Sequence, residues 1–347
     1  MKVLLLLPTC VFGYCLCFGG AAGFEVQELG GGGIMSVPVS MPTGLHDVFD
    51  FSKDGRCIWL SETNCYDLAG HQLEVGKLGE SSSPLTRMGW KNKFIGADIN
   101  YPFREIMGRI TSDMKAWLER DGCGRKIDLL YCHASLTFPP ASDPVVAAYF
   151  WPKGGVGDFV SIARFGENGE IGFGRTKKIE FTDPIANLDF SPDRRHFVMM
   201  QRGAQSLVFQ IKIMRADLGS DVSAYTDNSI MDVISVSELE QLLGEKWLLI
   251  RSGRGHGFAN ENYYVFACNR GGRSCFTARD YFVVYGLREK RIVKVFKSRL
   301  RWLDEGWPMR DTDFALSADE KYLAIRYDGE ITVYPFNQTT CQPCREK

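Results

Sequence analysis

The sequence lacks any marked excess of charge of one sign. Its 41 lysines and arginines nearly balance 42 aspartates and glutamates, which leaves a formal net charge of −1. Proteins that bind nucleic acids or anionic membranes concentrate Lys and Arg in runs or patches, and this chain contains no such run. The composition therefore gives no reason to expect a nucleic acid as a partner.

The chain also lacks the short motifs of common catalytic, phosphate and metal sites. It contains no GxGxxG or GxxxxGK[ST] loop and no GxSxG elbow. Among its five histidines, none has a second metal ligand at a suitable spacing, and a single CxxC pair does not make a zinc site. We expect no metal and no cofactor, and we expect structural roles for four of the histidines: His46, His71, His133 and His196.

No apolar run reaches the ~20 continuous residues that a membrane span requires. The first segment, Met1 to about Gly23, carries Lys2, then short apolar stretches interrupted by Pro8, then small residues. This layout predicts a cleaved secretory signal peptide. The alternatives are a retained anchor and lipidation of Cys10, Cys15 or Cys17. We therefore expect a secreted or periplasmic protein with no integral membrane span after cleavage, and a Gly-rich linker over residues 24–33.

Eight of the 11 cysteines follow the predicted cleavage site, and they fall in neighbouring pairs. An even number of cysteines behind a signal peptide predicts disulfides, although eight cysteines allow 105 pairings. Cys268 and Cys275 lie symmetrically about Gly271-Gly272, so a two-residue hairpin there would place them directly opposite each other. The predicted disulfide cysteines are Cys57, Cys65, Cys123, Cys132, Cys268, Cys275, Cys341 and Cys344.

Short apolar runs separated by turn residues predict an antiparallel all-β protein. Asp328-Gly329, between two such runs, is one of the clearest hairpin signals. Two stretches break this pattern and predict short helical insertions. Phe103–Arg120 has apolar residues at helical spacing, and the stretch from Ser235 to Gly244 has the residues of a capped helix.

One pattern occurs three times: an apolar residue, Ser, any residue, Asp, a short turn and then an apolar strand. It starts at Phe51, Phe190 and Leu316, so its copies lie 139 and 126 residues apart. A third of each interval is close to the ~40–45 residues of one four-stranded propeller blade. We expect the Ser and Asp side chains to bond local backbone and to fix the turn.

These features resemble those of WD-repeat-like β-propellers. Phe190-Ser191-Pro192-Asp193 and Tyr66-Asp67-Leu68-Ala69-Gly70 match two turns that recur in such blades. The resemblance covers residues 34–336 and implies about seven four-stranded blades, followed by a tail over residues 337–347. The strand predicted at Ile34–Val39 would complete the last blade, with Pro38 tolerated at the sheet edge. A β-sandwich, or two smaller β domains, is the alternative.

Two loops carry residue types that bind ligands. Arg254 and His256 lie in a glycine-rich stretch, which suits an anion, a sugar or simply a flexible turn. A second segment combines aromatic side chains, which stack on sugars, with acids that suit glycoside hydrolysis. A Trp-packed loop is its structural alternative. The candidates in this segment are Trp302, Asp304, Glu305, Trp307 and Asp311.

The sequence thus predicts a secreted or periplasmic β-propeller that binds a protein or glycan ligand and has no identifiable catalytic motif. The alternative is a carbohydrate-active enzyme that uses the acids around residues 304–313.

Overall fold

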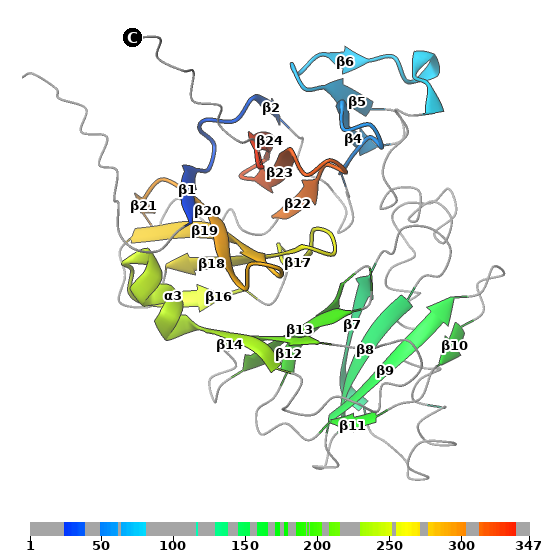
Figure 1. Cartoon of the computed structure of the whole chain (residues 1–347), viewed down its shortest axis with the longest axis vertical. Helices are drawn as coiled ribbons and strands as arrows, with labels where there is room; N and C mark the ends of the chain where they lie inside the picture. The colour runs from blue at the N-terminus through cyan, green and yellow to red at the C-terminus, as the bar shows by residue number, and fades with distance from the viewer. Residues whose placement is uncertain are drawn as a thin grey trace, which may run out of the picture.

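The structure is a computed structural model that describes residues 24–38, 49–61, 64–80, 116, 129–137, 145–152, 158–165, 171–173, 177–179, 185–191, 193, 195–202, 208–215, 230–251, 255–270, 277–302 and 312–337. For residue 61, for the described residues between 129 and 188, and for residues 190, 202, 301 and 302, only the backbone is described. The described chain is mostly β, as predicted, and Figure 1 shows its sheets succeeding one another around an arc. The predicted helix over Phe103–Arg120 lies outside the description, apart from residue 116.

The strands form four sheets, and most neighbouring strands are antiparallel. One four-stranded sheet has the order β3-β4-β5-β6, and its strands are β3 (Asp50–Phe51), β4 (Cys57–Ser61), β5 (Asn64–Asp67) and β6 (Gln72–Leu73). The second has the order β10-β9-β8-β7, with β11 also on β9. Its strands are β7 (Leu129–Thr137), β8 (Val145–Pro152), β9 (Asp158–Phe165), β10 (Ile171–Phe173) and β11 (Lys177–Ile179).

The largest sheet has 11 strands, in the order β1-β20-β19-β18-β16-β14-β13-β12, with β15, β17 and β21 attached at its sides. Its strands are β1 (Glu25–Glu28), β12 (Ile185–Phe190), β13 (His196–Arg202), β14 (Val208–Arg215), β15 (Ile230–Ser235), β16 (Leu248–Ile250), β17 (Gly257–Phe258), β18 (Tyr263–Arg270), β19 (Thr277–Gly286), β20 (Arg291–Lys297) and β21 (Arg301–Trp302).

The last sheet confirms that a strand near the N-terminus pairs with the end of the chain. β2 (Met35–Pro38) lies at the edge, followed by β24 (Glu330–Pro335), β23 (Tyr322–Tyr327) and β22 (Asp313–Leu316). Met35 pairs with Val333 and Pro38 with Glu330, in an antiparallel register. Pro38 is tolerated here because an edge strand needs hydrogen bonds on one side only.

Residues 24–33, predicted to be a linker, are more ordered than a linker. Glu25–Glu28 form β1, which pairs in parallel with β20, and Leu29 is buried. The Glu25 carboxylate lies 3.1 Å from the buried Lys294 ammonium, which also donates to the Pro335 carbonyl at 2.8 Å. A Cβ on Gly33 would lie 2.4 Å from the Thr332 side chain, so glycine allows this close approach.

The three Ser-x-Asp turns have the same structure, and each joins the first two strands of a meander. The buried serine hydroxyl donates to the aspartate, at 2.6 Å for Ser52 and Asp54, and it accepts a backbone N–H five residues later. A backbone bond from the serine N–H to that same residue closes each turn. The repeat therefore fixes turns, as predicted.

Replacing Ser317 with Ala should destabilise the fold by about 1–2 kcal/mol, because the partly buried Tyr322 N–H loses its hydroxyl acceptor. Chemical unfolding measures this change. Ser36→Ala is the matched control, because the Ser36 side chain lies on the exposed face of β2. An equal loss in the two variants would contradict a structural role for the turn.

The predicted capped helix is confirmed as α3 (Val236–Leu243). Ser235 accepts the Glu238 N–H, and the Glu238 carboxylate accepts the Ser235 N–H in return, which forms a capping box. Gly244 ends the helix in the left-handed conformation, with φ of 64°. The apolar face of α3 buries Leu239 against the large sheet.

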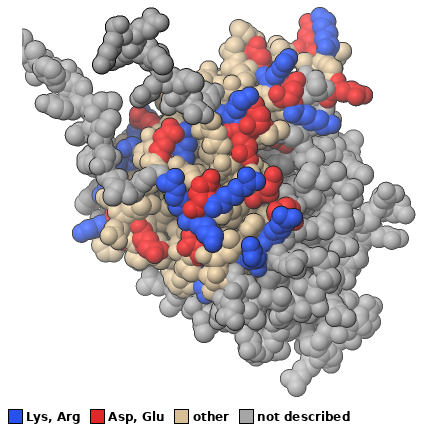
Figure 2. Space-filling view, in the orientation of Figure 1, with Lys and Arg blue, Asp and Glu red and all other residues tan. Residues whose placement is uncertain are grey.

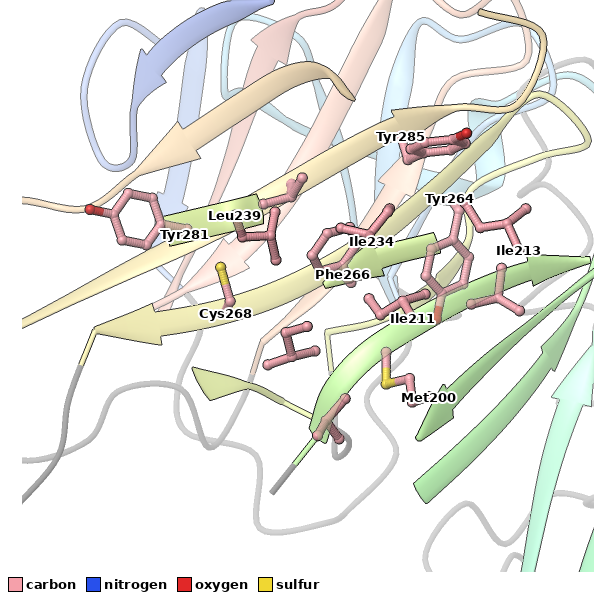
Figure 3. Packing of buried hydrophobic residues seen from close by; sticks show 14 of the residues in the cluster. Met200, Ile211, Ile213, Ile234, Leu239, Tyr264, Phe266, Cys268, Tyr281 and Tyr285 are labelled. Carbon is pink, nitrogen blue, oxygen red and sulfur yellow. The ribbon is translucent and has the colours of Figure 1, made fainter. Parts of the chain in front are cut away.

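The main core lies between α3 and the strands of the large sheet. In Figure 3, Leu239 from α3 and Ile211 and Ile213 from β14 point toward Phe266 and Tyr264 from β18. A second cluster joins the other face of β18 and β19 to β22–β24, and it includes Val265, Phe282 and Phe314. β18 and β19 are therefore buried on both faces, and the second cluster joins the large sheet to its neighbour.

Candidate functional site

The most unusual exposed side chain is that of Trp247, in the turn between α3 and β16. Its side chain is 64% exposed, and its backbone has φ of 64°, which is uncommon for a bulky residue. Two hydrogen bonds to Glu240, one on each side of Trp247 in the sequence, hold this turn. The Glu245 N–H donates to the Glu240 carbonyl at 3.0 Å, and the Leu248 N–H donates to the Glu240 carboxylate at 3.0 Å. Trp247 is thus presented to solvent on a fixed backbone.

Two arginines lie beside this turn, on β18 and β19. Arg270 and Arg279 occupy directly opposite positions in the antiparallel register, where like charges repel. The Glu245 carboxylate relieves the repulsion, since it accepts from Arg270 at 3.0 Å and from Arg279 at 3.1 Å. Glu245 is 9% exposed and the arginines 33% and 28%, so the carboxylate is internal and part of each guanidinium faces solvent.

Tyr281 is the third side chain that binds the Glu245 carboxylate. Its hydroxyl donates to the Glu245 carboxylate, and burial together with this carboxylate raises the pKa of Tyr281 above its ordinary value. The phenol therefore stays protonated and remains a donor at neutral pH. Every described polar group around Glu245 is a donor, which fixes the carboxylate and hence the two arginines.

The segment after β20 reaches the same end of the sheet. Leu300 is 46% exposed, and β21 follows it, with Trp302 opposite Thr277 of β19. Trp247 and the backbone of Trp302 are separated by about three strand spacings, or ~15 Å. We call the surface formed by Glu245, Trp247, Arg270, Arg279 and Leu300 the Trp247 rim.

The described surface in view carries charges of both signs rather than a large patch of one sign. Figure 2 shows Lys and Arg interspersed with Asp and Glu over the described part of the face in view. A surface of this kind does not attract polyanions at long range. Recognition at the rim would therefore depend on short-range contacts with Trp247 and the two guanidinium groups.

His256 has an internal position, whereas the sequence indicated a flexible, glycine-rich loop. Its Nδ1 lies 2.8 Å from the Asp189 carboxylate, and the side chains are 6% and 9% exposed. The Tyr264 hydroxyl donates to the same carboxylate at 2.8 Å. The imidazole thus links β12 to the strands that follow it. We call Asp189, His256 and Tyr264 the Asp189 cluster.

The other predicted ligand residues are not tested. Trp302 is described by its backbone alone. The remaining candidates lie outside the described residues: Arg254, Asp304, Glu305, Trp307 and Asp311.

Three of the predicted disulfide cysteines have described side chains, and all three are free thiols in this structure: Cys57, Cys65 and Cys268. The two-residue hairpin at Gly271-Gly272 is wrong. Cys268 pairs with Tyr281 and Arg270 with Arg279, so the connection is longer and Cys275 does not lie opposite Cys268. The side chains of the other predicted cysteines lie outside the description: Cys123, Cys132, Cys275, Cys341 and Cys344.

Sequence reasoning missed the Trp247 rim because its residues are far apart in the chain and carry no motif. Glu245 and Trp247 follow a predicted helix end, whereas Arg270 and Arg279 flank a loop whose register was predicted incorrectly. The only signal in the sequence was Trp247 itself, which closely follows the predicted helix end at Gly244.

Comparisons with known proteins do not assign a family. No family of known sequences matches the chain, and no curated protein does so either. Among the helices that the structure describes, none is long and apolar enough to cross a bilayer.

Several solved structures show distant likenesses. A complex of KlAtg21 with the coiled-coil of AgAtg16 aligns at 11% identity over 82% of this chain and 63% of that one, with a TM-score of 0.36. The uncomplexed acylaminoacyl peptidase of Pyrococcus horikoshii aligns at 12% identity over 55% and 27%, with a TM-score of 0.29. The WD40 domain of SCAP from fission yeast aligns at 9% identity over 87% and 71%, with a TM-score of 0.25.

The chain spans less than two thirds of the first two of these structures. Because all three TM-scores are below 0.5, these likenesses carry no argument about function.

Proposed function

We propose that the chain is a secreted or periplasmic β-propeller that acts as a binding module for a protein ligand, with the Trp247 rim as its binding surface. The propeller has about seven blades in this proposal. The observation that carries the binding role is the exposed Trp247 on a fixed, left-handed backbone beside two anchored arginines.

The arrangement of the sheets supports a propeller. Each Ser-x-Asp turn joins the first strand of a meander to its second strand, at β3, β12 and β22. These first strands also contact those of neighbouring meanders, since β12 touches both β7 and β17, and β22 touches β3. In a propeller, first strands line the central channel and so lie next to one another. In Figure 1, the sheets follow one another around an arc, and sheets whose first strands are in contact lie next to each other.

The chemistry of the rim favours a protein ligand. Trp and Arg are the side chains most enriched among the residues that dominate protein interfaces. Because the turn already holds Trp247 in place, binding would lose little conformational entropy there. The Glu245 carboxylate fixes both guanidinium groups, and their free N–H groups match acidic side chains of a ligand.

The left-handed backbone of Trp247 also favours a ligand-binding role for the rim. A non-glycine residue in the left-handed region costs on the order of 1–3 kcal/mol, and such strain clusters at functional sites. Burial of the indole does not compensate for this cost, because the side chain is 64% exposed. A ligand that covers the indole would supply the missing contacts.

The test is binding of peptides selected against the folded wild-type chain from a displayed peptide library. We expect the enriched peptides to contain acidic and apolar residues. Replacing Trp247 with Ala should weaken their binding by about 30-fold, the loss typical of an interface residue worth 2 kcal/mol. Calorimetric titration with a synthetic peptide measures this change.

Val26→Ala is the matched control, because Val26 is also a large exposed apolar side chain (49%) but lies on β1. Its affinity should stay within twofold of the wild type. If Trp247→Ala and Val26→Ala bind the selected peptides equally well, the rim is not the binding surface.

A further inference from the structure

Cys57 and Cys65 form a pair of buried thiols on one face of the β3–β6 sheet. Their side chains are 2% and 0% exposed, and they pack with Trp59 in a small apolar cluster. Trp59 lies directly opposite Cys65, and Cys57 lies opposite Asp67. The two cysteines are therefore diagonal neighbours across β4 and β5, and their side chains point to the same side of the sheet.

The two thiols differ in acidity because they interact with each other. A hydrogen bond from the Cys65 thiol lowers the pKa of Cys57 to about 7, while burial opposes this shift. The charges of Asp54 and Asp67 also oppose the shift. The same hydrogen bond, followed by burial, raises the pKa of Cys65 above its ordinary value. Cys57 is therefore the better nucleophile, and Cys65 is the thiol held next to it.

Diagonal positions in a sheet do not favour a permanent disulfide. Diagonal neighbours have Cα atoms about 7–8 Å apart, whereas most disulfides join Cα atoms separated by about 4.4–6.8 Å. Closing the bond therefore requires a local movement of the hairpin, and strained disulfides are more readily reduced. The register irregularity between Trp59 and Ser61 lies next to the pair and can absorb such a movement.

The pair lies in a part of the structure that can open locally. β6 has two residues and lies at the outer edge of its sheet, and in Figure 1 it lies on the side of this sheet away from β22–β24. Short edge strands with few buried contacts open at low free-energy cost. Such an opening would admit a small disulfide to Cys57.

We propose that Cys57 and Cys65 are a redox-active pair that exchanges with a small-molecule disulfide such as oxidised glutathione. The Cys57 thiolate attacks one sulfur of the small disulfide, whose S–S bond breaks and releases one thiolate. Cys65 then loses its proton and attacks the Cys57 sulfur of the mixed disulfide, which releases the second thiolate. Two protein thiols are oxidised to one disulfide, and one small disulfide is reduced to two thiols, which take up the protons.

The test is equilibration of the reduced, folded wild-type chain with defined ratios of reduced and oxidised glutathione. Differential alkylation and peptide mass spectrometry then report each cysteine. We expect a Cys57–Cys65 disulfide that forms and is reduced again within the glutathione range. Cys268 should remain unmodified in the folded chain, because it is fully buried and its pKa is raised by this burial and by Asp280.

Two near-isosteric variants assign the roles. Cys65→Ser should retain glutathione on Cys57 as a stable mixed disulfide, whereas Cys57→Ser should react at Cys65 at least tenfold more slowly. Three results on the wild type would each overturn the proposal, even if a variant failed to fold. They are no Cys57–Cys65 disulfide at any ratio, a disulfide that excess reduced glutathione cannot open, and equal initial reactivity of the two thiols.

Discussion

Replacing Asp189 with Asn should destabilise the folded protein by about 3 kcal/mol, because a buried carboxylate that binds two side chains loses its charge. The carboxylate accepts from the Tyr264 hydroxyl and bonds to His256 Nδ1. Both partners bind the same carboxylate oxygen, Oδ2, so an Asn carbonyl there would keep both contacts only as weaker bonds to a neutral acceptor. The Asn amide would also replace the other carboxylate oxygen, an acceptor, with a donor. Urea unfolding followed by circular dichroism measures the difference.

Two further variants make this result specific. Tyr264→Phe removes one of the two interactions and should cost about 1–2 kcal/mol. Asp328→Asn makes the same chemical change at an exposed turn with φ of 54°, where Asn is well tolerated. If Asp189→Asn is no less stable than Asp328→Asn, the Asp189 cluster does not hold β12 to β17 and β18.

The second large effect is expected at β2, where Val37→Asp should cost about 4 kcal/mol or more. Val37 is 5% exposed and packs with Ile331 and Val333 of β24. A carboxylate in this apolar cluster has no partner, so it must be neutralised or must pull β2 away from the sheet. Thermal unfolding should show a lower Tm, and hydrogen exchange should show lost protection along the β24 edge that β2 covers.

Ser36→Asp provides the matched comparison, one residue away on the same strand. Because side chains alternate across a strand, Ser36 faces solvent, although its hydroxyl donates to Glu330 at 3.0 Å. We expect a loss below about 1 kcal/mol, from the lost hydrogen bond and like-charge repulsion. Equal losses at the two positions would mean that β2 is not packed as the structure shows.

The elements that sequence reasoning predicted correctly are those whose signal is local. The three Ser-x-Asp turns depend on side chains that bond backbone within five residues. α3 carries both its stop and its start signal, in Gly244 and the Ser235–Glu238 box. The pairing of β2 with β24 is non-local. The sequence nevertheless predicted it, because the last blade needed one more strand and Ile34–Val39 could supply it.

The errors arose where tertiary contacts override local preference. Glu25–Glu28 has one apolar residue, Val26, and glycines follow it, so nothing in the sequence distinguishes β1 from a linker. Its strand is fixed by pairing with β20 and by the buried Lys294. Gly271-Gly272 looks like a tight hairpin, yet β18 and β19, which are buried along most of their length, pair in another register, with Cys268 opposite Tyr281. His256 looks like a loop residue, and only the distant Asp189 makes it internal.

The position of β2 also constrains when folding can finish. β2 is among the first described strands to leave the ribosome, whereas its partner β24 is the last of the described strands to be made. At 5–20 residues per second, roughly 15–60 s pass before Glu330–Pro335 exist. During that time the apolar face of Met35 and Val37 has no sheet to cover it, so the nascent chain carries an unpaired, aggregation-prone strand. This sheet can therefore form only after β24 has been made, by closure of a very long loop, which predicts slow folding with a late step at β2.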